Sequence, residues 1–160
     1  MKKTIYILLC ILAISCSKDS VQEIENNYPF DDSELELIDK INQHRVDISL
    51  PQLQILPHLG YLCSKNNQEM MRIGTICNCY LNESANSISR LYNTQHVSQI
   101  ALVNYSTSQS AMNAIMNDAT SKIIIERNYT DIGVAIIRDT NTNKKYYRKC
   151  LYRISFFINK

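Results

Sequence analysis

The first part of the chain places apolar residues at the spacing of a helix. Between residues 32 and 45 an apolar residue returns about every third position, which predicts an amphipathic helix. Asp32 or Ser33 is a suitable N-terminal cap, and acidic residues in the first turn favour the positive end of the helix dipole. The dipeptide Leu50-Pro51 interrupts the pattern, because proline disfavours helical geometry in the residue before it.

A second helix is predicted from Pro57 to Gly74. Proline fits the first turn of a helix, where its missing N–H group is not needed. Glycine after the last turn accepts the left-handed conformation that commonly ends a helix. The apolar face of this helix would consist of Leu59, Leu62, Cys63, Met70 and Ile73. A short third helix is expected from Ser84 to Tyr92.

The stretch from Asn104 to Val134 predicts a helix, a connecting loop and a core strand. Ser106 and Gln109 have the spacing of a capping box, in which two side chains bond the exposed N–H groups of a helix start. Alanine and isoleucine then recur at helical spacing. β-Branched residues crowd together from Ile123 onwards, which marks the end of the helical pattern. A polar turn leads into the strand GVAIIR.

The last part of the chain predicts a hairpin. The polar loop 139–143 separates the strand GVAIIR from a partner strand within residues 146–157. Residues 97–103, before the preceding helix, predict a short strand or an extended segment. The order of helix, helix, short helix, helix and hairpin predicts an α+β domain whose helices pack on a small antiparallel sheet.

The extreme N-terminus has the pattern of a secretory signal. Lys2 and Lys3 precede an apolar run of ten residues, shorter than the roughly 20 that span a bilayer. Small residues then precede Cys16, which resembles a bacterial lipoprotein signal and implies that Cys16 becomes the lipidated first residue. The predicted division of the chain is a signal peptide at 1–15, an acidic polar tether at 16–31 and a domain at 32–160.

Loss of the signal peptide changes the charge and the cysteine content. Without Lys2 and Lys3, 15 basic residues balance 15 acidic residues. We therefore expect no nucleic-acid partner, because nucleic-acid binding needs a basic surface. The cysteines that remain besides Cys16 are Cys63, Cys77, Cys79 and Cys150. Disulfides persist outside the cytoplasm, and four cysteines allow three pairings, among which the sequence does not choose.

Several segments, taken together, resemble the CAP superfamily, which comprises the cysteine-rich secretory, antigen 5 and pathogenesis-related proteins. They are INQHR, LPQLQI, EMMRIG, NAIMND and NYTDIGVAI. The resemblance extends from about Leu35 to Phe157. Within the superfamily, the chain is most similar to the bacterial SCP-like branch. It implies an α-β-α sandwich, in agreement with the predicted order of elements.

The resemblance also implies a cleft with two histidines and two acidic residues, which in this family sometimes holds a divalent metal. Carried over by position, the first histidine corresponds to Asn78 and the glutamate of the GEN-like motif to Gln99. The second acidic position corresponds to Ala119, and the second histidine to Ser121. Neutral amide and hydroxyl groups bind zinc poorly and do not titrate near neutral pH. We therefore expect neither a metal of the family type nor another cofactor.

These observations favour a binding or scaffold module over an enzyme. The expected protein is a degenerate SCP-like domain, held by lipid in a bacterial cell envelope and facing the periplasm or the cell surface. Its ligand, whether a small molecule, a glycan or a protein, is left open. The alternative is an enzyme of unknown, hydrolase-like class that uses the altered cleft or Cys77 and Cys79 as nucleophiles.

Overall fold

The structure is a computed structural model of the chain. It describes residues 27–75, 77, 80–92, 97–138 and, as backbone, 150–157. The elements in chain order are α2 (Asp32–Asp47), β1 (Gln54–Ile55), α3 (Pro57–Ile73), α4 (Leu81–Tyr92), β2 (Val97–Val103), α5 (Ser108–Asn117), α6 (Ala119–Ile125), β3 (Asp131–Arg138) and β4 (Cys150–Phe157).

The strands form one mixed sheet in the order β1-β3-β4-β2. β4 runs antiparallel to both of its neighbours, with Ile154 opposite Val134 of β3 and opposite Ile100 of β2. β1 joins the other edge in parallel, with Gln54 beside Asp131. The antiparallel sheet predicted from the sequence is therefore present in three strands. The parallel strand β1 was not predicted, because two residues are too few to show an alternating pattern.

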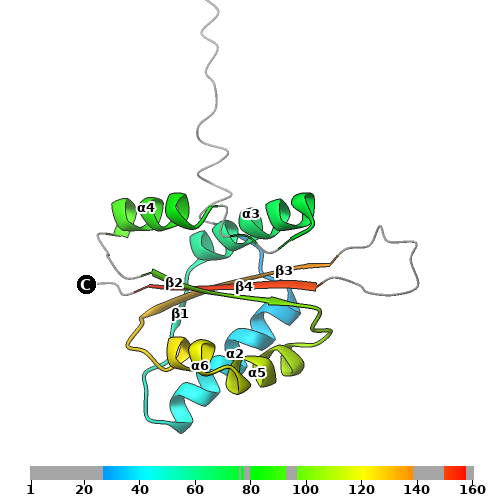
Figure 1. The fold of residues 1–160 in the computed structure, drawn as a ribbon. Helices are drawn as coiled ribbons and strands as arrows, with labels where there is room; N and C mark the ends of the chain where they lie inside the picture. The colour runs from blue at the N-terminus through cyan, green and yellow to red at the C-terminus, as the bar shows by residue number, and fades with distance from the viewer. Residues whose placement is uncertain (1–26, 76, 78–79, 93–96, 139–149, 158–160) are drawn as a thin grey trace, which may run out of the picture.

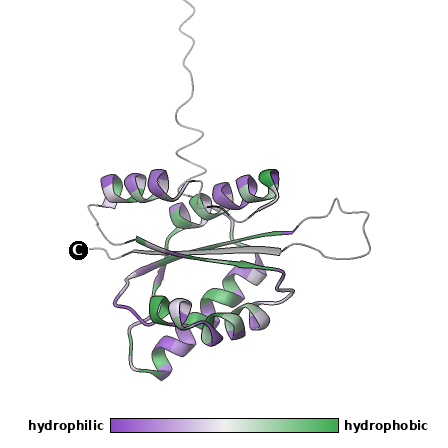
Figure 2. Cartoon of the chain, in the orientation of Figure 1, coloured by the Kyte–Doolittle hydropathy of each residue, from purple (hydrophilic) through white to green (hydrophobic). Residues whose placement is uncertain are grey.

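Helices cover both faces of the sheet, so the predicted α+β sandwich is confirmed. α3 and α4 lie on one face, and α2, α5 and α6 lie on the other (Figure 1). The helices carry both hydrophobic and hydrophilic residues along their length, as expected for helices with one face on a sheet (Figure 2).

Each face of the sheet has its own apolar core. The larger core joins α2, α5, α6, β2 and β3, and its fully buried members include Leu37, Ile41, Ile115, Ile125 and Val134. The smaller core lies on the α3–α4 face and consists of Leu59, Leu62 and Ile88, with Val97 packed against it. Apolar burial is the main stabilising term in folding, so both layers of helices are held by the same sheet.

Gly133 brings α3 into direct contact with β3. A Cβ atom at this position would meet the side chain and backbone of Leu59 and the backbone N of Gly60. Only glycine permits such a close approach of a strand to a helix. The first turn of α3 therefore lies directly on the middle of the sheet.

Two helix starts differ by one residue from the sequence prediction. Asp31, rather than Asp32 or Ser33, caps α2, and it forms a capping box with Glu34. Thr107, rather than Ser106, caps α5, with Ser110 as its partner. Both segments contain neighbouring hydroxyl or carboxylate residues with equal capping ability, and the burial of the following helix selects among them.

The predicted single helix is divided in two at Asp118, and its second part, α6, continues past Ile123 to Ile125, after which residues 126–130 connect to β3. The Asp118 side chain accepts a hydrogen bond from the backbone N–H of Ser121 and so starts this helix. Ile125 is fully buried in the larger core. Burial here outweighs the modest helix propensity of β-branched residues, on which the loop prediction relied.

The described end of the predicted tether packs on the domain. Tyr28 donates a hydrogen bond to Glu34 at 2.9 Å, and Phe30 packs against the larger core. The rings of Tyr28 and Phe30 also lie against Gly60 of α3. The predicted hairpin loop 139–143 lies outside the described residues, as does the predicted signal peptide. Within the described part, no helix has the length and apolar character needed to cross a bilayer.

Candidate functional site

Among the predicted cleft positions that the structure describes, Gln99 alone lies on the α3–α4 face of the sheet. Successive side chains of a strand point to opposite faces. Ile100 belongs to the larger core and Val97 to the smaller one, so Gln99 points with Val97 towards α3 and α4. The Nε2 atom of Gln99 is buried. Gln99 is therefore half-buried, with its amide nitrogen covered on the α3–α4 side of the sheet.

Ala119 and Ser121 lie on the opposite side of the sheet, in α6. Ala119 is exposed, whereas Ser121 is 8 % exposed and bonds to Asp118. The structure therefore brings Ala119 and Ser121 together but separates both from Gln99. Asn78 lies outside the described residues.

Asp118 is an ionisable group at this site that the sequence reasoning missed. Hydrogen bonds from the side chain and backbone of Ser121 hold the pKa of the Asp118 carboxyl below its usual range. The sequence pattern placed Asp118 only among residues that recur at helical spacing. Its spacing to Ser121, three residues on, is the signal of an N-terminal cap that would have identified it.

The described residues form no cluster of three or more His, Cys, Asp or Glu side chains that could hold a metal ion. The two cysteines with described side chains differ in state. Cys77 is disulfide-bonded, whereas Cys63 is a buried thiol on the face of α3 that packs on β3, with its Sγ 3.6 Å from the carbonyl oxygen of Gly133. A sulfur in a disulfide is not a thiolate nucleophile, so Cys77 in this state cannot act as the alternative hypothesis requires. Because Cys63 is a thiol, the pairing of all four cysteines is excluded.

Glu34 and Arg45 of α2 are buried polar residues on the side of the larger core, and both form hydrogen bonds with the backbone. Glu34 accepts hydrogen bonds from the N–H groups of Asp31 and Ile136 at 2.9 and 2.8 Å. Burial raises the pKa of the Glu34 carboxyl, and the hydrogen bonds only partly oppose this. Because β1 is short, Ile136 lacks a strand partner on that side, and Glu34 replaces one. This position is structural rather than catalytic.

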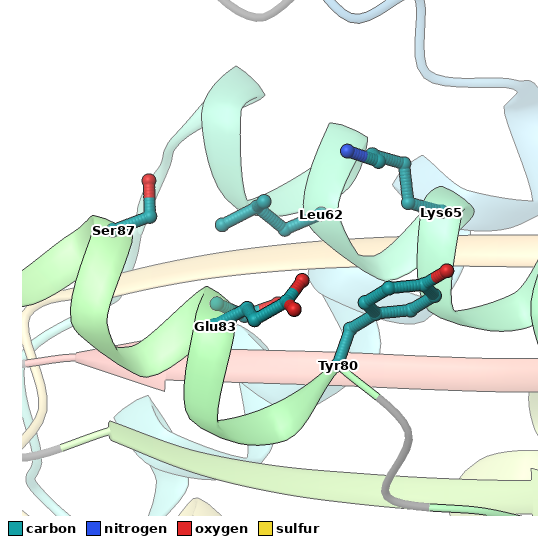
Figure 3. A pocket seen from close by; sticks show the side chains of 6 residues that line it. Leu62, Lys65, Tyr80, Glu83 and Ser87 are labelled. Carbon is teal, nitrogen blue, oxygen red and sulfur yellow. The ribbon is translucent and has the colours of Figure 1, made fainter.

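A pocket of about 200 Å³ lies between α3 and α4 (Figure 3). Its lining residues are Leu62 and Lys65 from α3, and Tyr80, Glu83, Ser84 and Ser87 from the start and first turns of α4. In Figure 3 the Lys65 and Glu83 side chains extend from the two helices into the space around Leu62, with the Tyr80 ring beside them. None of these residues belongs to the predicted cleft.

No sequence signal predicts this pocket, because its residues match no motif. They come from separate helices, and their polar side chains look like the solvated faces of two amphipathic helices. Only the packing of α4 beside α3 brings them together.

The comparisons with known proteins agree on one family. The model of the cysteine-rich secretory protein family matches residues 38–152. No curated protein sequence matches the chain.

Solved structures with this fold come from several bacteria. A cysteine-rich secretory protein from Staphylococcus aureus has a TM-score of 0.66 at 16 % identity, and the match covers 84 % of this chain and 42 % of that chain. An outer surface protein of Borrelia burgdorferi has a TM-score of 0.61 at 17 % identity, covering 82 % of this chain and 97 % of that chain. An extracellular SCP-domain protein of Bacillus anthracis has a TM-score of 0.63 at 12 % identity, covering 88 % of this chain and 50 % of that chain. The chain thus spans half or less of the staphylococcal and anthrax proteins and nearly all of the Borrelia protein.

Proposed function

Because the chain belongs to the cysteine-rich secretory protein family, we propose that it is an extracytoplasmic binding module without catalytic activity. In this proposal a lipid on Cys16 holds the domain at a bacterial membrane. The domain then presents its surface to a ligand in the cell envelope.

The observation that carries the proposal is the chemistry of the family positions. Gln99 and Ser121 carry neutral side chains, Ala119 carries none that is polar, and Gln99 points away from α6. A general base must titrate near the working pH, and a zinc site needs imidazole, thiolate or carboxylate ligands. The ionised Asp118 is already engaged by Ser121, and one carboxylate does not make such a site.

Two independent features support the envelope location. The N-terminal sequence has a basic start, a short apolar run and small residues before Cys16. The similar structures from Borrelia burgdorferi and Bacillus anthracis are described as an outer surface protein and an extracellular protein.

The loss of metal chemistry is tested by titrating the purified chain with Zn²⁺ in a calorimeter. We expect no stoichiometric binding tighter than about 10 μM, which corresponds to about −7 kcal/mol. The Gln99→Ala and Ser121→Ala variants serve as controls for the location of any binding. Tight, stoichiometric Zn²⁺ binding by the unmodified chain would overturn the proposal, and its loss in one of the two variants would locate the ion.

The lipid anchor is tested by expressing the chain in a bacterium fed with radiolabelled palmitate. We expect label in the unmodified protein and none in Cys16→Ser, because lipidation needs the Cys16 thiol. Cys63→Ser is the matched control and should keep the label, since Cys63 is buried on the face of α3 that packs on β3. Equal labelling of Cys16→Ser, or no labelling of any form, contradicts the anchor.

A further inference from the structure

We propose that the pocket between α3 and α4 binds a small zwitterion of the α-amino-acid class. Its carboxylate would face Lys65 and Ser84, and its ammonium group would face Glu83. The inference rests on the proposed binding role but concerns a different place in the molecule, on the opposite face of the sheet from Ser121.

The charges of the pocket are the first argument. Lys65 and Glu83 both line it, yet neither forms an ion pair with any described residue. The Lys65 ammonium instead lies 5.5 Å from the centroid of the Tyr61 ring, one turn earlier on α3. This cation–π contact restricts the lysine without neutralising its charge. A ligand with one charge of each sign complements this pair, whereas a ligand with a single charge leaves one of them without a partner.

The second argument is a polar wall that the described residues leave incomplete. Ser84 lines the pocket and is 3 % exposed, and its Oγ accepts a hydrogen bond from Asn66 Nδ2 at 3.5 Å. Among the described residues no hydrogen bond uses the hydroxyl proton of Ser84, so it can be donated to a ligand carboxylate. Asn66 is 2 % exposed, and its Oδ1 has no hydrogen-bond partner in the described part of the chain. Buried polar atoms normally have partners, and Asn66 bonds the lining residue Ser84 without lining the pocket itself, so a water between Asn66 and a ligand would complete this polar wall.

Size and apolar surface limit the ligand further. The volume of about 200 Å³ is below the roughly 300–1,000 Å³ of pockets that hold drug-sized molecules. Leu62 and the Tyr80 ring offer apolar contact beside the charged groups (Figure 3). These dimensions suit one amino acid with an aliphatic side chain better than a longer peptide or an oligosaccharide.

The test is ¹H–¹⁵N NMR titration of the purified full chain with l-leucine. We expect saturable shifts of the amides of residues 62–66 and 83–87 at millimolar ligand. Isoamylamine, which is leucine without its carboxylate, and 4-methylpentanoate, which lacks the ammonium group, should each bind at least about tenfold more weakly. N-Acetylglucosamine tests a neutral hydroxylated ligand of similar size.

Charge-removing variants locate the binding. Lys65→Gln and Glu83→Gln should each weaken l-leucine binding about tenfold, a typical loss for one partner of a charge-assisted contact. Lys40→Gln and Glu36→Gln are matched controls, because these charges lie on α2, on the other face of the sheet, and both variants should bind l-leucine as the unmodified chain does.

Three results would overturn the inference. They are no saturable shift with l-leucine, unchanged binding in Lys65→Gln and Glu83→Gln, or binding of N-acetylglucosamine that is as tight as that of l-leucine. None of these three results changes the outcome expected in the zinc and palmitate experiments. Failure of the pocket to bind an amino acid can therefore be distinguished from failure of the proposed function.

Discussion

Arg45 is fully buried and acts as a hydrogen-bonding centre for two chain segments. Its guanidinium donates to the carbonyl oxygens of Pro51, Ile125, Arg127 and Tyr129 at 2.7–3.2 Å. Ile125 ends α6, and the other three carbonyls belong to irregular backbone after α2 and after α6. Backbone carbonyls that are buried need donors, and one planar group with five N–H bonds supplies them.

Arg45→Met should therefore destabilise the protein by about 3 kcal/mol or more, because several buried acceptors lose their donors at about 1–3 kcal/mol each. Arg45→Lys should recover only part of this, since an ammonium group cannot reach all four oxygens in one plane. Urea unfolding followed by circular dichroism measures the loss. Arg90→Met, an exposed arginine of α4, is the control and should change stability by no more than about 0.5 kcal/mol. Equal stability of Arg45→Met and the unmodified chain would contradict the structural role.

Glu34 makes a pH-dependent contribution to the stability of the folded protein. Its pKa is raised in the folded protein, chiefly by burial, so folding favours the protonated carboxyl. The contribution of Glu34 to stability is therefore greatest below the ordinary pKa of glutamate, and it decreases as the pH rises through the raised folded value.

Glu34→Gln should destabilise the protein by about 1–3 kcal/mol, because the amide presents N–H groups towards the N–H donors of Asp31 or Ile136. The glutamine does not titrate, so the stability gap to the unmodified chain should be wider at pH 4 than at pH 7. Urea unfolding at both pH values measures this gap. Glu36→Gln, exposed on the same helix and paired only with Lys40 in the described structure, should show a small gap at both values. A stability difference between the unmodified chain and Glu34→Gln that widens as the pH rises would contradict a raised pKa for Glu34 in the folded protein.

At the scale of elements, the contact of α3 with β3 depends on Gly133. Gly133→Ala should destabilise the protein by about 1–3 kcal/mol or more, because the added methyl group meets helix backbone that cannot rotate away. Gly74→Ala separates this effect from conformational strain. Gly74 has φ +74° with open space around it, so its substitution should cost only about 1 kcal/mol. Thermal unfolding of both variants gives the comparison, and a smaller loss for Gly133→Ala than for Gly74→Ala would show that the close contact is not required.

The elements that sequence reasoning predicted well are those with strong local signals. Pro57 and Gly74 bracket α3 as expected, and Gly74 takes the left-handed conformation. The end of α6 was missed because Ile123, Ile124 and Ile125 suggest a strand locally, whereas burial of Ile125 in the larger core decides for a helix. Local propensities differ by less than about 1 kcal/mol per residue, so tertiary packing can reverse them.

The candidate site was less predictable than the fold. The neutral residues at the family positions can be read from the sequence, but their separation cannot. Gln99 and Ser121 are placed on opposite faces by the alternation of β2 and by the return of the chain as α6. The α3–α4 pocket depends on how two helices pack, which no local pattern of Lys65 or Glu83 encodes.

At the scale of the whole molecule, one sheet supports two cores, so the layers should unfold together. Ile100 and Val97 of the same strand β2 pack into the larger and the smaller core, respectively. Loss of either helical layer would expose one face of every strand. A domain of this size is expected to unfold in a single cooperative transition.

Cys63 reports on that transition, because it is fully buried between α3 and β3 and its Sγ contacts the Gly133 carbonyl. Iodoacetamide should alkylate Cys63 at least about a thousandfold more slowly in native buffer than in denaturing urea, since the unfolded fraction of a stable domain is about 10⁻³ or less. Peptide mass spectrometry separates Cys63 from other thiols. In Gly133→Ala the native rate should rise by about tenfold for each 1.4 kcal/mol of lost stability, because labelling requires opening of the same α3–β3 contact. Rapid alkylation of Cys63 in native buffer would mean that α3 opens independently of the sheet. So would an alkylation rate that is the same in Gly133→Ala as in the unmodified chain.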